Sequence, residues 1–237
     1  MNKKVKLDFE NTKIKEKEIE LKGITLFIGT NNDIEIIMKD ILKQSLTINY
    51  KYDCKTREIS NNMDFETFFN IYRRPKLDFE KITKSDTLNK LNKFILEEII
   101  VDRYEKYENF DILNSSNSLK KFIILKMMIE TDFLNLKDNF VLILTDTESS
   151  LHPIWQIKYI EFLVMLIKEF SNIKIVLNTF SPYQLYALKI YKEKYKINDR
   201  FDFFFVEKSN NKKITFIEDK SFETGFYSFN IPLYDLE

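Results

Sequence analysis

Apolar and polar residues fall into two patterns along this 237-residue chain. Segments 5–9 and 14–21 alternate apolar with polar residues, which predicts strands with one wet face. A further strand is expected over 46–55. Continuous apolar runs are typical of strands buried on both faces of a sheet, and they occupy 24–28, 140–144, 173–177 and 203–206.

Apolar residues at helical spacing predict helices between these strands. Ser85 and Asp86 suit a helix N-cap, and Pro153 pre-sets the backbone of a first helical turn. The expected helices span 31–44, 86–107, 154–170 and 184–195, with another directly after Ser116–Ser118.

Buried strands that alternate with helices indicate an α/β fold. We expect a mostly parallel sheet with helices on both faces, preceded by antiparallel N-terminal strands. Ligands of such sheets bind beyond the carboxyl ends of the strands. In this chain those ends are Gly29–Asp33, Thr145–Glu148 and Asn178–Pro182.

The composition excludes several classes of site. Lys and Arg number 37 and so do Asp and Glu, so a nucleic-acid contact must come from a local basic patch. Cys54 and His152 are the only cysteine and histidine, which excludes an intramolecular disulfide and a His-rich zinc site. No segment has the apolar core of a signal peptide or the length of a membrane span, so we expect a cytoplasmic protein without membrane contact.

Two short motifs carry a family resemblance. Leu151–Gln156 reads L-H-P-I-W-Q, and Ser181–Tyr183 reads S-P-Y. With the strand, loop and helix near the start, they resemble the ABC-type ATPase head, in particular the prokaryotic branch related to SMC proteins, DNA-repair ATPases and OLD nucleases. The resemblance covers about 1–45 and 112–196 and implies a P-loop NTPase-like fold. It implies one domain over 1–237, with 46–111 as a short helical, lid-like insert.

The segment that corresponds to the family's phosphate-binding loop has lost the residues that bind phosphate. A working loop needs a second glycine, a lysine and a hydroxyl residue, whereas isoleucine, Glu35 and isoleucine stand at these positions. Two like charges about 4 Å apart repel by roughly 4 kcal/mol at an effective dielectric of about 20. Glu35 therefore opposes phosphate binding. The segment reads Gly29, Thr30, Asn31, Asn32, Asp33, Ile34, Glu35 and Ile36.

The resemblance also locates the family's other catalytic positions, and each is changed. Thr145 replaces the metal-binding Asp, the shorter Asp146 replaces the Glu that positions water, and Phe180 replaces the switch histidine. We therefore expect no ATP hydrolysis and no cofactor beyond weak nucleotide or cation binding. The signature motif remains as Ser116, Asn117 and Ser118, with serine for its glycine.

Other polar residues form candidate sites without the resemblance. Asp146 and Glu148 form a candidate divalent-cation site, although paired carboxylates at a strand end more often form a solvated turn or cap. His152 precedes a helix, which favours capping over catalysis, and Cys54 has no nearby histidine to activate it. A basic cluster is the candidate contact for a DNA backbone, and it comprises Arg73, Arg74 and Lys76.

Loss of the catalytic residues within an intact apolar framework predicts a catalytically inactive ATPase-head homologue. The resemblance implies a DNA-associated or scaffolding component of a prokaryotic defence system against mobile elements, with the DNA-end-binding ring of CRISPR spacer acquisition as one model. It also implies a homodimer or higher oligomer, with double-stranded DNA and a defence-system protein as partners. Two alternatives stay open: a divergent head that binds and hydrolyses ATP, and an interaction subunit of an active ATPase or nuclease.

Overall fold

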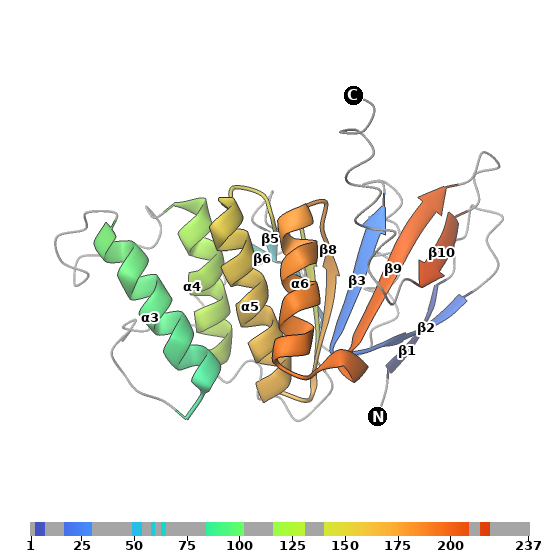
Figure 1. Cartoon of the computed structure of the whole chain (residues 1–237), viewed down its shortest axis with the longest axis horizontal. Helices are drawn as coiled ribbons and strands as arrows, with labels where there is room; N and C mark the ends of the chain where they lie inside the picture. The colour runs from blue at the N-terminus through green and yellow to red at the C-terminus, as the bar shows by residue number, and fades with distance from the viewer. Residues whose placement is uncertain are drawn as a thin grey trace, which may run out of the picture.

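A computed structural model shows a layer of helices packed on a large sheet (Figure 1). In the described residues, eight strands form one sheet in the order β10-β9-β3-β8-β7-β4-β5-β6, and β1 pairs with β2 separately. The structure describes residues 3–7, 17–29, 49–53, 58–59, 63–64, 84–101, 116–130, 140–208 and 214–218.

The central strands of the large sheet are parallel, which confirms the predicted sheet type. They pair in the order β9 (Phe201–Lys208), β3 (Ile24–Gly29), β8 (Ile173–Asn178), β7 (Phe140–Thr145) and β4 (Asn49–Asp53). Antiparallel strands continue the sheet on both sides, and these are β10 (Ile214–Glu218), β5 (Glu58–Ile59) and β6 (Met63–Asp64). The predicted antiparallel N-terminal pair is also confirmed, as β1 (Lys3–Leu7) and β2 (Lys17–Leu21).

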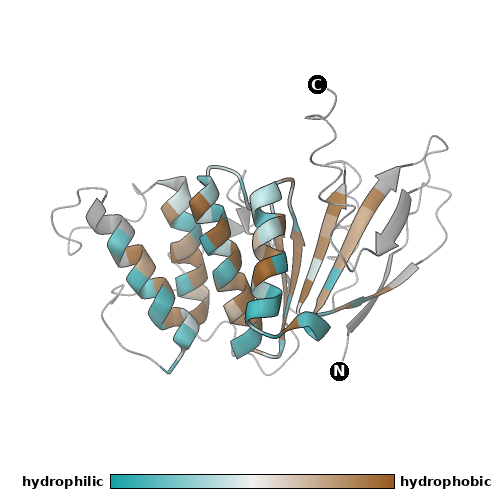
Figure 2. Ribbon diagram, in the orientation of Figure 1, coloured by the Kyte–Doolittle hydropathy of each residue, from teal (hydrophilic) through white to brown (hydrophobic). Residues whose placement is uncertain are grey.

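The longer helices lie side by side across one face of the sheet (Figure 1). Figure 2 shows hydrophilic and hydrophobic residues interspersed along these helices and mostly hydrophobic residues on the strands behind them. This layer gives the molecule a broad helical surface on that face. The helices are α3 (Asp86–Val101), α4 (Asn117–Glu130), α5 (Pro153–Glu169) and α6 (Pro182–Lys194), followed by the short 3-10 helix η3 (Asn198–Arg200).

Both faces of the central strands are buried. Leu26, Leu142 and Leu177 belong to the core formed with the helices. Their alternating neighbours point to the other face, and Phe27 and Val176 there are 0% exposed. This burial is expected of a sheet covered on both sides. The helix predicted over 31–44 lies outside the described residues.

The region assigned to an insert contributes to both layers. β4 falls within it and pairs in parallel with β7, so its first strand belongs to the main sheet. α3 packs against α4 and α5, where the Phe94 ring contacts Phe122, Trp155 and Phe162 at centroid distances of 4.7, 5.6 and 5.7 Å. The end of the helix predicted to 107 lies beyond the described residues.

Polar side chains define where the helices begin. Ser85 Oγ accepts from Leu88 N at 3.0 Å, and His152 Nδ1 accepts from Ile154 N at 3.4 Å, so the capping predicted for both is confirmed. α6 begins at Pro182 rather than at 184, because Ser181 is its N-cap and proline suits the first turn. None of the described helices has the length and apolarity needed to cross a membrane.

Candidate functional site

Three strand ends meet at one edge of the sheet. β3, β8 and β7 are parallel neighbours, so Gly29, Asn178 and Thr145 end side by side. Segments far apart in the sequence therefore converge where ligands of such sheets bind. The predicted site residues outside the described part of the chain are Thr30, Asn31, Asn32, Glu35, Arg73, Arg74 and Lys76, and Cys54 lies outside it too.

The turn that follows β7 is held by α4. Lys121 is only 2% exposed, and its Nζ donates to the carbonyl oxygens of Thr147 at 3.0 Å and Asp146 at 3.5 Å. It also donates to Ser149 O, while Ser118 Oγ donates to Ser150 O. The signature remnant at the start of α4 thus contacts a turn of its own chain, and a buried ammonium fixes the backbone of that turn.

Asp146 has a backbone role in this turn. Its φ is +50°, in the left-handed region, and Ser150 at the end of the turn has a φ of +62°. Asp and Asn enter this region more readily than most other side chains. The structure therefore gives Asp146 a conformational reason to be there that is separate from catalysis.

Glu148 links the turn after β7 to the loop after β8. Its Oε1 accepts from Phe180 N at 2.8 Å, and its Oε2 accepts from Thr179 Oγ1 at 3.2 Å. Both carboxylate oxygens are thus bonded within the chain by neutral donors. Among the described residues, no group of three or more His, Cys, Asp and Glu side chains is placed to hold a metal. Cation binding by Asp146 and Glu148 stays a prediction.

The two family-like motifs bind each other. Gln156 Nε2 donates to Leu151 O at 2.9 Å, and Gln156 Oε1 accepts from Ser181 Oγ. Ser181 N in turn donates to Thr179 Oγ1 at 3.0 Å. The glutamine of L-H-P-I-W-Q and the serine of S-P-Y therefore join the start of α5 to the start of α6.

Trp155, the aromatic residue of the motif Leu151–Gln156, packs between helices. Its ring contacts Phe94 of α3 and Phe122 of α4, each at 5.6 Å between centroids and close to edge-on. Edge-to-face aromatic pairs contribute about 0.5–1.5 kcal/mol beyond the area they bury. The Trp155 side chain thus packs α5 against α3 and α4.

Two neighbouring strands end in buried polar side chains. Thr145 and Asn178 follow the cross-strand pair Leu144 and Leu177, so they lie side by side on the same face. They are 9% and 5% exposed, and neither Thr145 Oγ1 nor Asn178 Oδ1 finds a hydrogen-bond partner among the described residues. The family resemblance places a carboxylate at position 145, where this chain has a neutral hydroxyl beside the neutral amide of Asn178.

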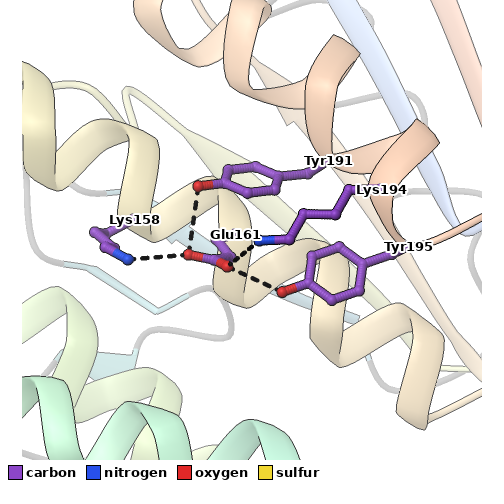
Figure 3. A network of polar contacts seen from close by, with 5 residues as sticks. All are labelled: Lys158, Glu161, Tyr191, Lys194 and Tyr195. Atoms are coloured by element: carbon purple, nitrogen blue, oxygen red, sulfur yellow. Dashed lines mark hydrogen bonds and ion pairs between the residues drawn. The ribbon is translucent and has the colours of Figure 1, made fainter.

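A second polar network lies between α5 and α6 (Figure 3). Glu161 accepts from Tyr195 Oη at 2.9 Å and from Lys158 Nζ at 3.2 Å. Tyr191 Oη and Lys194 Nζ each donate to it at 3.3 Å. The Glu161 carboxylate is thus surrounded by two cations and two phenols.

The network shifts the pKa values of its members. Burial alone raises the pKa of Glu161, but hydrogen bonds from Tyr195 and Lys158, with the charge of Lys158, bring it below its ordinary value. Burial, and then the negative charge of Glu161, raise the pKa of Tyr191 to about 12. The pKa of Tyr195 is raised as well, by burial and by its hydrogen bond to Glu161.

Sequence reasoning missed Lys121 and Glu161. Lys121 precedes Leu125 by four residues and Met128 by seven, so helical spacing placed it on the buried side of α4. Glu161 stands within a run of apolar residues of α5, which also signals burial. The spacing of both residues was visible, but their partners were not.

Comparisons with known proteins find similarity to solved structures. No protein-family model matches the sequence, and no curated protein matches it. The solved structure of cbiO1 from Clostridium perfringens, part of the ABC transporter complex cbiONQ, is similar with a TM-score of 0.49 and 13% sequence identity. The match covers 99% of this chain and 94% of that one.

Proposed function

We propose that the chain is a catalytically inactive ABC-type ATPase head that acts as a DNA-associated or scaffolding component of a prokaryotic defence system. The mostly parallel sheet with its helical layer is the framework that such a head requires. The motifs at Leu151–Gln156 and Ser181–Tyr183 supply the family resemblance.

The observation that carries the proposal is that the polar groups of the turn after β7 are hydrogen-bonded within the chain. The resemblance assigns this turn the metal-binding and water-positioning carboxylates. Thr145 provides no carboxylate, and both oxygens of Glu148 are engaged by Thr179 and Phe180. Lys121 holds the carbonyl oxygens of the same turn. These contacts stabilise the fold and engage Glu148, one of the two carboxylates of the candidate cation site.

A scaffolding role agrees with the motif residues that the chain keeps. Gln156 and Ser181 join two helix starts, and Trp155 joins three helices. These are contacts that maintain a framework. The changed positions, Thr145 and Phe180, are those to which the resemblance assigns chemistry.

Calorimetric titration of the full chain with ATP and Mg²⁺ tests the inactive head. We expect no saturable heat up to millimolar nucleotide and no phosphate release. Micromolar affinity that is abolished by Asn31→Ala with Glu35→Ala would overturn the proposal and favour the ATP-hydrolysing alternative. Lys93→Gln is the matched control, because Lys93 is 78% exposed on α3.

A separate experiment tests the scaffolding role. We expect light scattering to show a homodimer or larger assembly whose mass does not change with ATP. Purification from the native host, followed by mass spectrometry, identifies stoichiometric partners. An active ATPase or nuclease as constant partner would favour the interaction-subunit alternative over DNA association.

A further inference from the structure

Three lysines from three different helices converge on one tyrosine ring. The Nζ atoms of Lys90 in α3, Lys168 in α5 and Lys194 in α6 lie 6.0, 5.4 and 5.3 Å from the centroid of Tyr195. Lys194 Nζ also lies 5.2 Å from the Tyr191 centroid. We call these three lysines and the Tyr195 ring the Tyr195 cluster. Cation–π attraction at such distances is about 0.5–1 kcal/mol at exposed sites.

Helix dipoles explain only part of the cluster. Lys168 and Lys194 lie in the last turns of α5 and α6, where a positive charge is favourable. Lys90 lies one turn into α3, four residues after Asp86, where the helix dipole gives a cation no such benefit.

Two lysines of the cluster have no carboxylate partner among the described residues. Lys158, Lys194 and Glu161 form a shared network in which one carboxylate serves two lysines. Glu169, which follows Lys168 in the chain, accepts from the backbone N of Thr87 at 3.0 Å. No ion pair of Lys90 or Lys168 occurs among the described residues, and an external anion would relieve the mutual repulsion of the ammonium groups.

The geometry suits an extended polyanion. All three ammonium groups lie near one ring, so no two of them are farther apart than about 11 Å. This separation is close to the Debye length of roughly 10 Å at 0.1 M salt, so the three charges act together on a nearby anion. Lys90 and Lys168 are exposed, and Lys194 keeps 55% of its side chain exposed. The helices that carry them lie side by side as a layer (Figure 1), which offers a surface rather than a pocket.

We propose that the Tyr195 cluster contacts the phosphate backbone of duplex DNA, an inference that rests on the DNA-associated role proposed above. Lysine contacts to phosphates on a broad surface position DNA without reading its sequence. The large apolar residues exposed on α6, Tyr183, Tyr186 and Ile190, lie at helical spacing along the side of the helix that carries Lys194. An anionic lipid surface is therefore the alternative that the experiment has to separate from DNA.

Mobility-shift titrations of the full chain with a linear duplex at rising salt test this assignment. Lys90→Gln with Lys168→Gln removes two charges but leaves the Glu161 network intact. We expect this variant to bind about tenfold or more weakly at 0.1 M salt. The slope of log K against log salt should fall by about 0.9 for each phosphate that the variant no longer neutralises. Lys90→Arg with Lys168→Arg keeps both charges and should bind as the wild type does.

Arg73→Gln with Arg74→Gln is the matched control, since it removes the same charge from the other basic candidate. DNA binding that is abolished in this control and unchanged in Lys90→Gln/Lys168→Gln would overturn the assignment while DNA association stands. No binding by the wild type at low salt would instead remove DNA association itself. Binding to phosphatidylserine vesicles without binding to DNA would identify a membrane surface and overturn the proposal. Equal thermal unfolding by circular dichroism confirms that each variant is folded.

Discussion

Two glutamates organise two polar regions of this molecule, and their partners differ in charge. Glu148 at the strand ends is bonded by a hydroxyl and a backbone N–H, both neutral. Glu161 between α5 and α6 is bonded by two ammonium groups and two phenols. The first arrangement is satisfied within the chain. Beside the second lie Lys90 and Lys168, which have no ion pair among the described residues and are available to an anion.

This difference reverses the expectation from the family resemblance. The resemblance places ligand binding at the strand ends, where β3, β8 and β7 finish. The turn and loop after β7 and β8 are instead engaged with each other, whereas Lys90 and Lys168, which lack ion pairs among the described residues, lie on the helical layer. We infer that the strand-end region stabilises the fold and that the helical layer carries the interaction with a partner. Stability and DNA-binding measurements separate these two roles.

The largest expected effect comes from the buried lysine in the strand-end region. Lys121→Met keeps the aliphatic stem but leaves the carbonyl oxygens of Asp146, Thr147 and Ser149 without their donor. Hydrogen bonds to charged groups contribute about 1.5–3 kcal/mol each. We expect the free energy of unfolding in urea to fall by about 3 kcal/mol. Lys93→Met, at an exposed position, should stay within about 0.5 kcal/mol of the wild type.

Glu148→Gln should destabilise the protein by about 2 kcal/mol, because an uncharged amide oxygen accepts from Phe180 N more weakly than a carboxylate and the amide nitrogen gives the Thr179 hydroxyl no acceptor. Its partners are neutral, so the destabilisation should be the same at low and high salt. Urea unfolding at two salt concentrations measures both quantities. A destabilisation that shrinks strongly with salt would show that charge dominates the strand-end region as well.

Glu161→Gln is the matched change in the second region and should cost about 1–2 kcal/mol near neutral pH. Salt should reduce this cost, because two of the partners are partly exposed cations. The folded pKa of Glu161 is lowered, so its contribution is present above pH 4.5 and is lost as pH falls through the folded value. The stability gap between wild type and variant should therefore narrow in acid, as urea unfolding at several pH values will show.

Tyr191→Phe should cost about 1 kcal/mol at about pH 8, since it removes one hydrogen bond to Glu161. The raised pKa of Tyr191, about 12, means that the wild type loses this contribution as pH rises from 10.0, the unfolded value, toward 12. The cost of the substitution should thus shrink over that range. A cost that is constant up to pH 12 would show that the phenol titrates alike in folded and unfolded chains.

The smallest effect is expected at Asp146. Asp146→Gly relieves the left-handed backbone and should raise stability by up to about 1 kcal/mol. If the residue has only this conformational role, DNA binding should also be unchanged. Loss of a nucleotide-dependent activity in this variant would assign Asp146 to catalysis and remove the distinction between the two regions.

Sequence reasoning succeeded where the local pattern of apolar and polar residues decides the secondary structure. The apolar runs at 24–28, 140–144 and 173–177 became parallel strands because they can be buried on both faces. Ser85 began a helix as predicted, because its hydroxyl accepts from a free backbone N–H group. These outcomes depend on local geometry.

The strand order and the polar networks could not be predicted, because they depend on partners distant in sequence. Glu161 meets Tyr195 34 residues away, and Lys121 meets Thr147 26 residues away. A local window indicates that Lys121 lies on the buried side of its helix, but it does not show which groups the lysine contacts. The apolar run at 203–206 did not specify the register in which β9 pairs with β10. The strand is also longer than this run, since β9 spans Phe201–Lys208.

Trp155 gives the molecule a built-in optical reporter. It is the only tryptophan of the chain, and its indole touches the rings of Phe94 and Phe122 where α3, α4 and α5 meet. Its intrinsic emission therefore reports on a single junction within the helical layer. A partner that docks across α3 and α5 and shifts one helix against the other would change the wavelength or intensity of this signal, without any label attached.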